Sequence, residues 1–300
     1  MDPEMTMLIL GGLIGLVGAI IGGIAQGVLN YLVARKRGAK HEAQDWLEMA
    51  LNWDGKQSLR GANLRQADLT GIELPRADLA HADLQGAVLR GANLQWSDLG
   101  GANLKEADLL DADLKGSHLR AADLYKACLQ GAELHGAELR GAILQEADLV
   151  RAILQKAELG GANLQWANLS EANLQGANLW MANLQRANLV EANLRGACLR
   201  SAELQGSHLG GANLQGADLS LVDLWRANLW GANLQGADLT EAMLRRAVLW
   251  RADLQEADLR GADLSVTILE RAELGGAKAD AKTKWPEGFQ VPDTVVMMED

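Results

Sequence analysis

The sequence predicts a narrow all-β solenoid preceded by a single membrane-spanning helix. Leucine occupies every fifth position from Leu59 to Leu274, 44 times without exception. Alanine stands two residues before the leucine in 37 of the 43 cases from Ala62 to Ala272, and Asp or Asn lies between them in 27 of 43. A short, fixed period is typical of repeat architectures, in which each unit buries its apolar face only against its neighbours.

A period of five fits neither regular element and indicates a coil with short sides. On an α-helix a five-residue step turns about 140° around the axis, so no apolar face forms. In an extended segment, however, the alanine and the leucine point the same way and the residue between them points outward. Asp and Asn suit that outward place because their side chains hydrogen-bond to nearby backbone at turns. Each pentad is therefore predicted to form one side of a narrow, solid coil, although the period alone does not give the number of sides.

The repeats resemble those of the pentapeptide repeat proteins, as in residues 161–189, which read GANLQWANLSEANLQGANLWMANLQRANL. The resemblance implies a right-handed quadrilateral β-helix with four pentads per coil, hence about 11 coils and a rod about 50 Å long. The central position is leucine throughout this chain, whereas the family has Leu or Phe there. Residues 281–289, AKTKWPEGF, resemble the segment that often ends cyanobacterial members.

Residues 7–33 predict a membrane-spanning helix, because only Gln26, Asn30 and Tyr31 interrupt an apolar run longer than the roughly 20 residues that a bilayer requires. Basic residues follow this run and acidic ones precede it, so the positive-inside rule predicts an inner-membrane protein with its solenoid in the cytoplasm. A cleaved signal peptide is the alternative, but it requires a basic start and a shorter apolar core. The expected segments are a tail at 1–6, the membrane helix at 7–33, a basic segment with a capping helix at 34–55, the solenoid at 56–277 and a C-terminal cap and tail at 278–300.

Small residues recur at every fourth position of the membrane segment: Gly11, Gly15, Ala19, Gly23 and Gly27. This spacing places them on one helix stripe, where a second helix can approach closely, and it predicts a homo-oligomer in the bilayer. The alternative is that glycine is simply common in membrane helices. If the stripe assembles a ring, the protein is a small oligomeric pore or channel.

Both ends of the solenoid are expected to be covered. Residues 41–53 predict a short amphipathic helix whose acidic polar face argues against a place on the membrane surface, and Trp285 and Phe289 follow the last repeats. Unpaired strand edges at the two ends favour such caps. The expected capping residues are Trp46, Leu47, Leu51, Trp285 and Phe289.

The composition argues against enzymatic chemistry and against general nucleic-acid binding. The net charge is −11, whereas nucleic-acid binding needs a basic footprint. The two cysteines, Cys128 and Cys198, fit a reduced compartment and are too far apart along the solenoid for a disulfide. No two of the five histidines lie one four-sided coil apart, so no metal site is expected, and no nucleophile stands with a matched base. We therefore expect no catalytic, metal or cofactor-binding residues and no cofactor.

A cluster of tryptophan and arginine near the C-terminal end is the candidate partner site, because these residue types dominate binding hot spots. Its members are Trp225, Arg226, Trp230, Arg245, Arg246, Trp250 and Arg251. The alternative is that the indoles are isolated surface groups. An asparagine belt from Asn163 to Asn193 is better explained by turn chemistry than by binding.

The expected function is a non-enzymatic, membrane-tethered scaffold that binds an unidentified protein. One alternative is the pore. Another is protection of DNA gyrase by an acidic rod that imitates DNA, an activity that the family resemblance implies for some members. The acidity here is spread over the sides rather than striped, and a membrane helix suits gyrase protection poorly.

Overall fold

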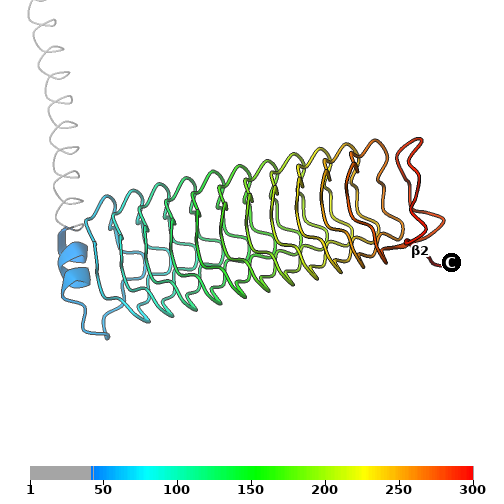
Figure 1. The fold of residues 1–300 in the computed structure, drawn as a ribbon. Helices are drawn as coiled ribbons and strands as arrows, with labels where there is room; N and C mark the ends of the chain where they lie inside the picture. The colour runs from blue at the N-terminus through cyan, green and yellow to red at the C-terminus, as the bar shows by residue number, and fades with distance from the viewer. Residues whose placement is uncertain (1–41, 43, 300) are drawn as a thin grey trace, which may run out of the picture. The chain divides into compact units, whose positions relative to one another are not determined.

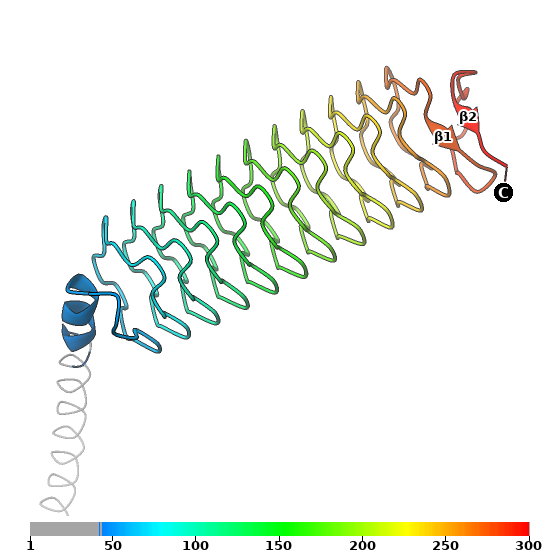
Figure 2. The same cartoon turned by 90° about the horizontal axis from the view of Figure 1, so that it is seen from below.

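The computed structural model describes residue 42 and residues 44–299. The predicted membrane helix at 7–33 and its glycine stripe lie outside these residues. No helix in the described part of the chain is long and apolar enough to cross a membrane. The chain divides into two compact units, Met1–Trp46 and Leu47–Asp300. The second unit is a stack of similar coils that forms an elongated rod (Figures 1 and 2).

Each coil of the rod has four sides. Parallel bridges join each outward residue to the one four pentads further along, beginning with Asn63 to Asp83 and continuing to Asp258 with Lys278. The 44 repeat leucines, taken four to a coil, therefore make 11 coils. Backbone bonds link successive coils, for example from the N–H of Leu174 to the carbonyl of Asn193 at 2.7 Å. The β-helix and the four pentads per coil expected from the sequence are confirmed.

The interior contains one leucine and one small residue from each side. All 44 repeat leucines are buried, and none is more than 5% exposed. Three serines that replace alanine are also buried, and each hydroxyl donates to the carbonyl oxygen of the leucine three residues earlier, as Ser97 does to Leu94 at 2.7 Å. These buried hydroxyl groups are thus each hydrogen-bonded to a backbone carbonyl oxygen of the same coil.

Every outward Asp or Asn of the repeats fixes the turn that follows it. All 27 accept a hydrogen bond from the backbone N–H two residues later, as Asn173 does from Gln175 at 3.2 Å. The expectation that these residues serve turn chemistry is confirmed. The same bonds explain the asparagine belt, where amides also bond between coils, as from Asn188 to Asn168 at 3.0 Å.

Each corner places its second residue in the left-handed region of backbone space. The φ angle is positive at all 44 such positions from Gly61 to Gly276, and 25 of these residues are not glycine. The tight bond from the alanine N–H to the preceding leucine carbonyl, as from Ala172 to Leu169 at 3.0 Å, closes a β-turn that requires this conformation. The stacked ladder therefore holds many side chains in a conformation that they rarely adopt on their own.

Val266 is the residue least suited to its corner, and its replacement by glycine is expected to stabilise the rod. It is β-branched, has a φ of 61° and is 64% exposed, so it gains little from burial. Val266→Gly should raise the free energy of unfolding by about 1 kcal/mol, measured by denaturant unfolding. Gly141→Val is the matched reverse change, because φ is +64° there and a Cβ would meet no atom within 4 Å. A lower stability for Val266→Gly would contradict this account of the corners.

The N-terminal end of the rod carries a short helix at residues 44–51. From Leu47 onward the helix belongs to the same unit as the coils and lies beside the first of them (Figures 1 and 2). Ala50 is buried at 1% exposure, whereas Leu51 is 60% exposed, so the predicted capping role of Leu51 is corrected in favour of Ala50. Leu47 is half-buried. Trp46 ends the first unit, so its part in a cap stays a prediction.

The C-terminal end of the rod carries a further strand pair, and the capping role expected of Trp285 and Phe289 stays a prediction. Strand β1 (Lys278–Ala279) pairs in parallel with β2 (Val296–Met297), which adds a further layer beyond the last repeat. Trp285 and Phe289 are half-buried and their rings stack at a centroid distance of 5.5 Å. The aromatic pair therefore lies in the loop that leads from β1 to β2.

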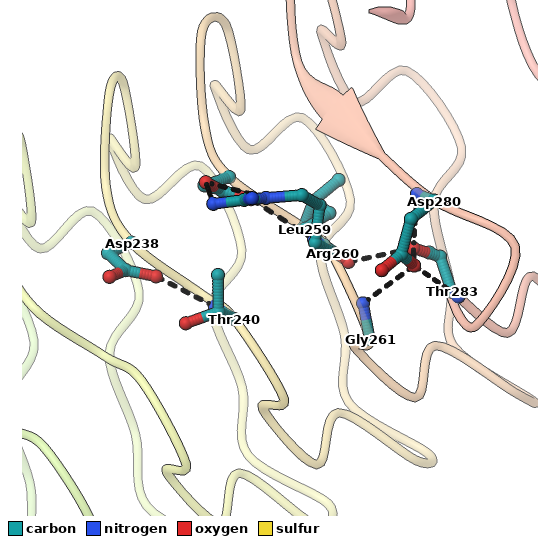
Figure 3. A network of polar contacts seen from close by, with 8 residues as sticks. Asp238, Thr240, Leu259, Arg260, Gly261, Asp280 and Thr283 are labelled. Atoms are coloured by element: carbon teal, nitrogen blue, oxygen red, sulfur yellow. Dashed lines mark hydrogen bonds and ion pairs between the residues drawn. The ribbon is translucent and has the colours of Figure 1, made fainter. Parts of the chain in front are cut away.

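Asp280 ends the regular ladder by substituting a carboxylate for a carbonyl. At earlier corners the second residue donates its N–H to a backbone carbonyl of the next coil, as Glu241 does to Arg260 at 2.9 Å. At Gly261 the N–H instead donates to Oδ1 of Asp280, also at 2.9 Å (Figure 3). The same oxygen accepts from the N–H groups of Lys282 and Thr283 at 3.1 and 2.9 Å. One side chain thus satisfies the corner at which the chain leaves the repeat.

The cap at Asp280 is expected to weaken in acid. The Gly261 N–H, followed by the Thr283 hydroxyl and the other amides, holds the pKa of Asp280 below the ordinary aspartate value of 3.8. A carboxyl whose folded pKa is lowered stabilises the fold above its unfolded pKa, and that stabilisation disappears as the pH falls through the lower folded pKa. The protection factor of the Gly261 amide, which removes the intrinsic pH dependence of exchange, should therefore fall below a pH of about 4, and Asp280→Asn should remove much of that fall. A wild-type protection factor that stays constant as the pH is lowered would contradict this role.

Candidate interaction surface

The seven clustered residues lie on two adjoining corners of the rod and are called the Trp–Arg patch: Trp225, Arg226, Trp230, Arg245, Arg246, Trp250 and Arg251. The side between the two corners is defined by the bridges that join Asn228, Val248 and Ile268 in successive coils. Residues one coil apart occupy equivalent corners of neighbouring coils, so Arg226 lies next to Arg246 along the rod. The structure therefore brings the predicted residues together.

Aromatic and guanidinium groups in the patch are already stacked on one another. The rings of Trp230 and Trp250 stack with a centroid distance of 6.1 Å and an interplanar angle of 8°, as their separation by one full coil predicts. Arg251 lies over the Trp250 ring at 4.4 Å, and Arg226 lies over the Trp225 ring at 4.3 Å. These contacts fix long side chains in place before any partner arrives, which lowers the entropic cost of binding.

Arg271 and an apolar side complete the surface, and neither was predicted from the sequence. The guanidinium of Arg271 lies 5.7 Å from the centre of the Trp250 ring. Val248 and Ile268 occupy outward positions between the two corners, and Ile268 is 44% exposed. The sequence did contain a signal for this apolar side, because positions 248 and 268 lack the Asp or Asn that most outward positions have. Val248 and Ile268 thus form a short apolar strip beyond Asn228, with tryptophan and arginine on the neighbouring corners.

Charge on the two corners is opposite in sign to that of the whole chain. Positions 225, 226, 230, 231, 245, 246, 250, 251, 265, 266, 270 and 271 contain five arginines and one glutamate, a net charge of +4. The chain as a whole has a net charge of −11. An acidic rod therefore carries a basic, aromatic surface near one end.

Most ion pairs elsewhere on the rod follow one of two simple rules, and Arg260–Asp258 is an exception within a single pentad. A cation at the first corner position pairs with the outward carboxylate that precedes the equivalent corner of the next coil, as Arg65 does with Asp83 at 3.1 Å. A cation at the second corner position pairs with a carboxylate at the equivalent position of the next coil, as Arg151 does with Glu171 at 3.0 Å. Other pairs of the first kind include Arg60–Asp78, Arg90–Asp108, Lys105–Asp123, Arg120–Glu138 and Arg140–Glu158.

The patch breaks both rules. One coil after Arg226 stands Arg246, and one coil after Arg251 stands Arg271, so like charges occupy neighbouring coils. Asp263, the outward carboxylate that the first rule assigns to Arg245, instead contacts Lys284 at 3.4 Å and the Ser265 hydroxyl. In the described part of the chain none of the five arginines forms an ion pair with a carboxylate. Their guanidinium N–H groups are thus available to an external acceptor.

The described residues offer no comparable arrangement for metal or redox chemistry. No group of three His, Cys, Asp or Glu side chains among them is placed to hold a metal ion. Cys128 and Cys198 are free and half-exposed. The Trp–Arg patch is therefore the best-defined candidate site.

The repeats match a known family over most of the chain. The pentapeptide repeat model matches eight times, in copies that together run from residue 58 to residue 280. The chain belongs to the pentapeptide repeat family. No curated protein matches it.

Solved pentapeptide repeat structures resemble this member of the family. HetL, involved in heterocyst differentiation regulation in the cyanobacterium Nostoc sp. strain PCC 7120, is 41% identical; the match covers 72% of this chain and 90% of HetL, with a TM-score of 0.37. Full-length QnrB1, a plasmid-mediated fluoroquinolone resistance protein, is 19% identical over 71% of this chain and 92% of its own, with a TM-score of 0.27. A protein of the Arabidopsis thaliana thylakoid lumen is 32% identical over 34% and 67%, also with a TM-score of 0.27.

Proposed function

We propose that this pentapeptide repeat protein is a non-enzymatic scaffold whose Trp–Arg patch binds a partner protein. The observation that supports the proposal is the patch itself, in which aromatic rings and unpaired guanidinium groups gather on a rod whose other arginines mostly face carboxylates. Tryptophan and arginine contribute most of the energy in many protein interfaces. The repeats supply a rigid support, because every patch residue lies on the same continuous ladder as the buried leucines.

We propose that residues 7–33 hold the rod at the inner membrane, with the rod on the cytoplasmic side. The support is the length and apolarity of that segment and the basic residues that follow it. Its glycine stripe favours a homo-oligomer. Replacing Gly15, Gly23 and Gly27 by leucine should reduce cross-linking between subunits in membranes, while extraction of the protein by detergent stays unchanged. Unchanged cross-linking would show that the glycine stripe does not mediate self-association. A ring of many subunits in detergent would favour a pore instead of a scaffold.

The patch is tested by removing its stacked indoles. The double variant Trp230→Ala with Trp250→Ala should lose specific partners in affinity purification from membranes. Its melting temperature should stay close to that of the wild type, since outward positions do not contact the leucine core. The matched control is Trp166→Ala, because Trp166 is 53% exposed and is covered by Arg186 at 4.6 Å but lies outside the patch. Equal recovery of partners by the double variant and the wild type would refute this function.

A further inference from the structure

We infer that the Trp–Arg patch recognises an acidic segment of a partner protein that alternates carboxylates with aliphatic side chains. The inference rests on the proposed function and specifies the chemistry of the partner. Its starting point is the net charge of +4 on the two corners, set against −11 for the chain. It also rests on the apolar strip that runs between those corners.

The unpaired arginines set the first requirement on the partner. Stacked like charges such as Arg226 and Arg246 repel each other in the free protein, and no carboxylate of the described chain compensates them. A guanidinium presents a planar set of N–H donors that matches the two oxygens of a carboxylate. Carboxylates from a partner would satisfy these donors and relieve the repulsion at the same time.

The strip between the corners sets the second requirement. Val248 and Ile268 stand side by side in neighbouring coils with no polar group of their own to offer. An aliphatic side chain of the partner can cover them while its acidic neighbours reach the corners on either side. In the coil of Val248 the order across the rod is thus basic (Arg245 and Arg246), apolar (Val248) and basic (Arg251). Its complement is acidic, apolar and acidic.

The geometry of the rings disfavours single-stranded nucleic acid as the anionic partner. Single-stranded nucleic acid binds by stacking bases on free aromatic faces. Here the Trp250 ring is stacked on Trp230 and contacted by two guanidinium groups, and the Trp225 ring is covered by Arg226. A protein surface needs no free ring faces.

The test uses the full-length protein and three synthetic peptides that differ only in charge. The first carries glutamate and leucine, the second replaces each glutamate by glutamine, and the third replaces it by lysine. The glutamate peptide should bind at least about tenfold more tightly than the glutamine peptide, and its affinity should fall as salt is raised. The lysine peptide should not bind.

Two charge-reversed variants locate the binding site. Arg246→Glu with Arg251→Glu should weaken binding of the glutamate peptide at least about tenfold. Arg186→Glu with Arg195→Glu changes the net charge equally but lies outside the patch, and it should bind like the wild type. Equal loss in both variants would show a long-range charge effect and overturn the inference.

The remaining outcomes separate this inference from the proposed function. Anionic lipid vesicles and a single-stranded oligonucleotide are measured beside the peptides, and patch-dependent binding of either one in preference to the glutamate peptide would overturn the inference. If no acidic peptide binds but the tryptophan variant still loses its partners, the inference fails and the patch is a protein site of another chemistry. If the peptide binds but partner recovery is unchanged by the tryptophan variant, the proposed function fails instead.

Discussion

Ala172→Leu is expected to lower the free energy of unfolding by roughly 1–3 kcal/mol. Ala172 is 0% exposed and sits beside Leu174 on one side of a central coil. The alanine positions set the width of the coil, and each coil is hydrogen-bonded to the coils before and after it, so the backbone cannot move aside locally. The added isobutyl group must therefore distort several layers of the ladder.

Denaturant unfolding measures this effect, with Gln175→Leu as the matched control. Gln175 belongs to the same coil and is exposed, so the same side chain placed there should change stability by less than about 0.5 kcal/mol. An Ala172→Leu protein as stable as the control would show that the inward positions are wrongly assigned.

Leu174→Ala is expected to have the larger effect, a loss of about 2–5 kcal/mol. Leu174 is 0% exposed, and a cavity at its place interrupts the leucine column between the coils below and above it. In a solenoid each coil depends on its neighbours, so a defect in the middle weakens the connection between the two halves. Limited proteolysis should then cut near residue 174 before it reaches either end.

The last repeat leucine, Leu274, provides the comparison for this variant. Leu274 is 4% exposed and lies near the C-terminal end of the rod. Leu274→Ala should cost less and should not produce a cut in the centre of the rod. Equal costs at Leu174 and Leu274, with no central cleavage, would contradict the nearest-neighbour account.

Much of the rod could be predicted because one period carries several physical signals at once. The inward direction of Ala172 and Leu174, the turn bond at Asn173 and the stacking of Trp230 on Trp250 all follow from the pentad and its four-sided coil. The number of sides did not follow from the period. It came from the family resemblance and is confirmed by the bridges.

Other features could not be predicted because their causes are not local. Arg151 and Val266 give no hint of a positive φ, since the stacked ladder imposes that conformation on whatever side chain is present. Asp280 bonds the corner at Gly261 only because the chain beyond it departs from the repeat. Leu51 has the right helical spacing for a cap, yet the smaller Ala50 is the one that is buried.

The sequence identified only part of the candidate site, because some of its contacts join residues of different coils. Residue type alone identified the tryptophans and most of the arginines. Arg271 was missed because its contact with Trp250 joins two coils, and Ile268 was missed because a single outward isoleucine is unremarkable without its neighbour Val248. The two pairing rules, once known from the structure, show which arginines lack a carboxylate.

The central claim is that the arginines of the patch serve a partner and not the fold. It is tested most directly by measuring stability and binding of one variant, Arg246→Gln with Arg251→Gln. Because this variant removes repulsion between stacked like charges, its melting temperature at low salt should equal or exceed that of the wild type, while partner recovery and glutamate-peptide binding are lost. A lower melting temperature with undiminished binding would show that these arginines stabilise the rod and would contradict the claim.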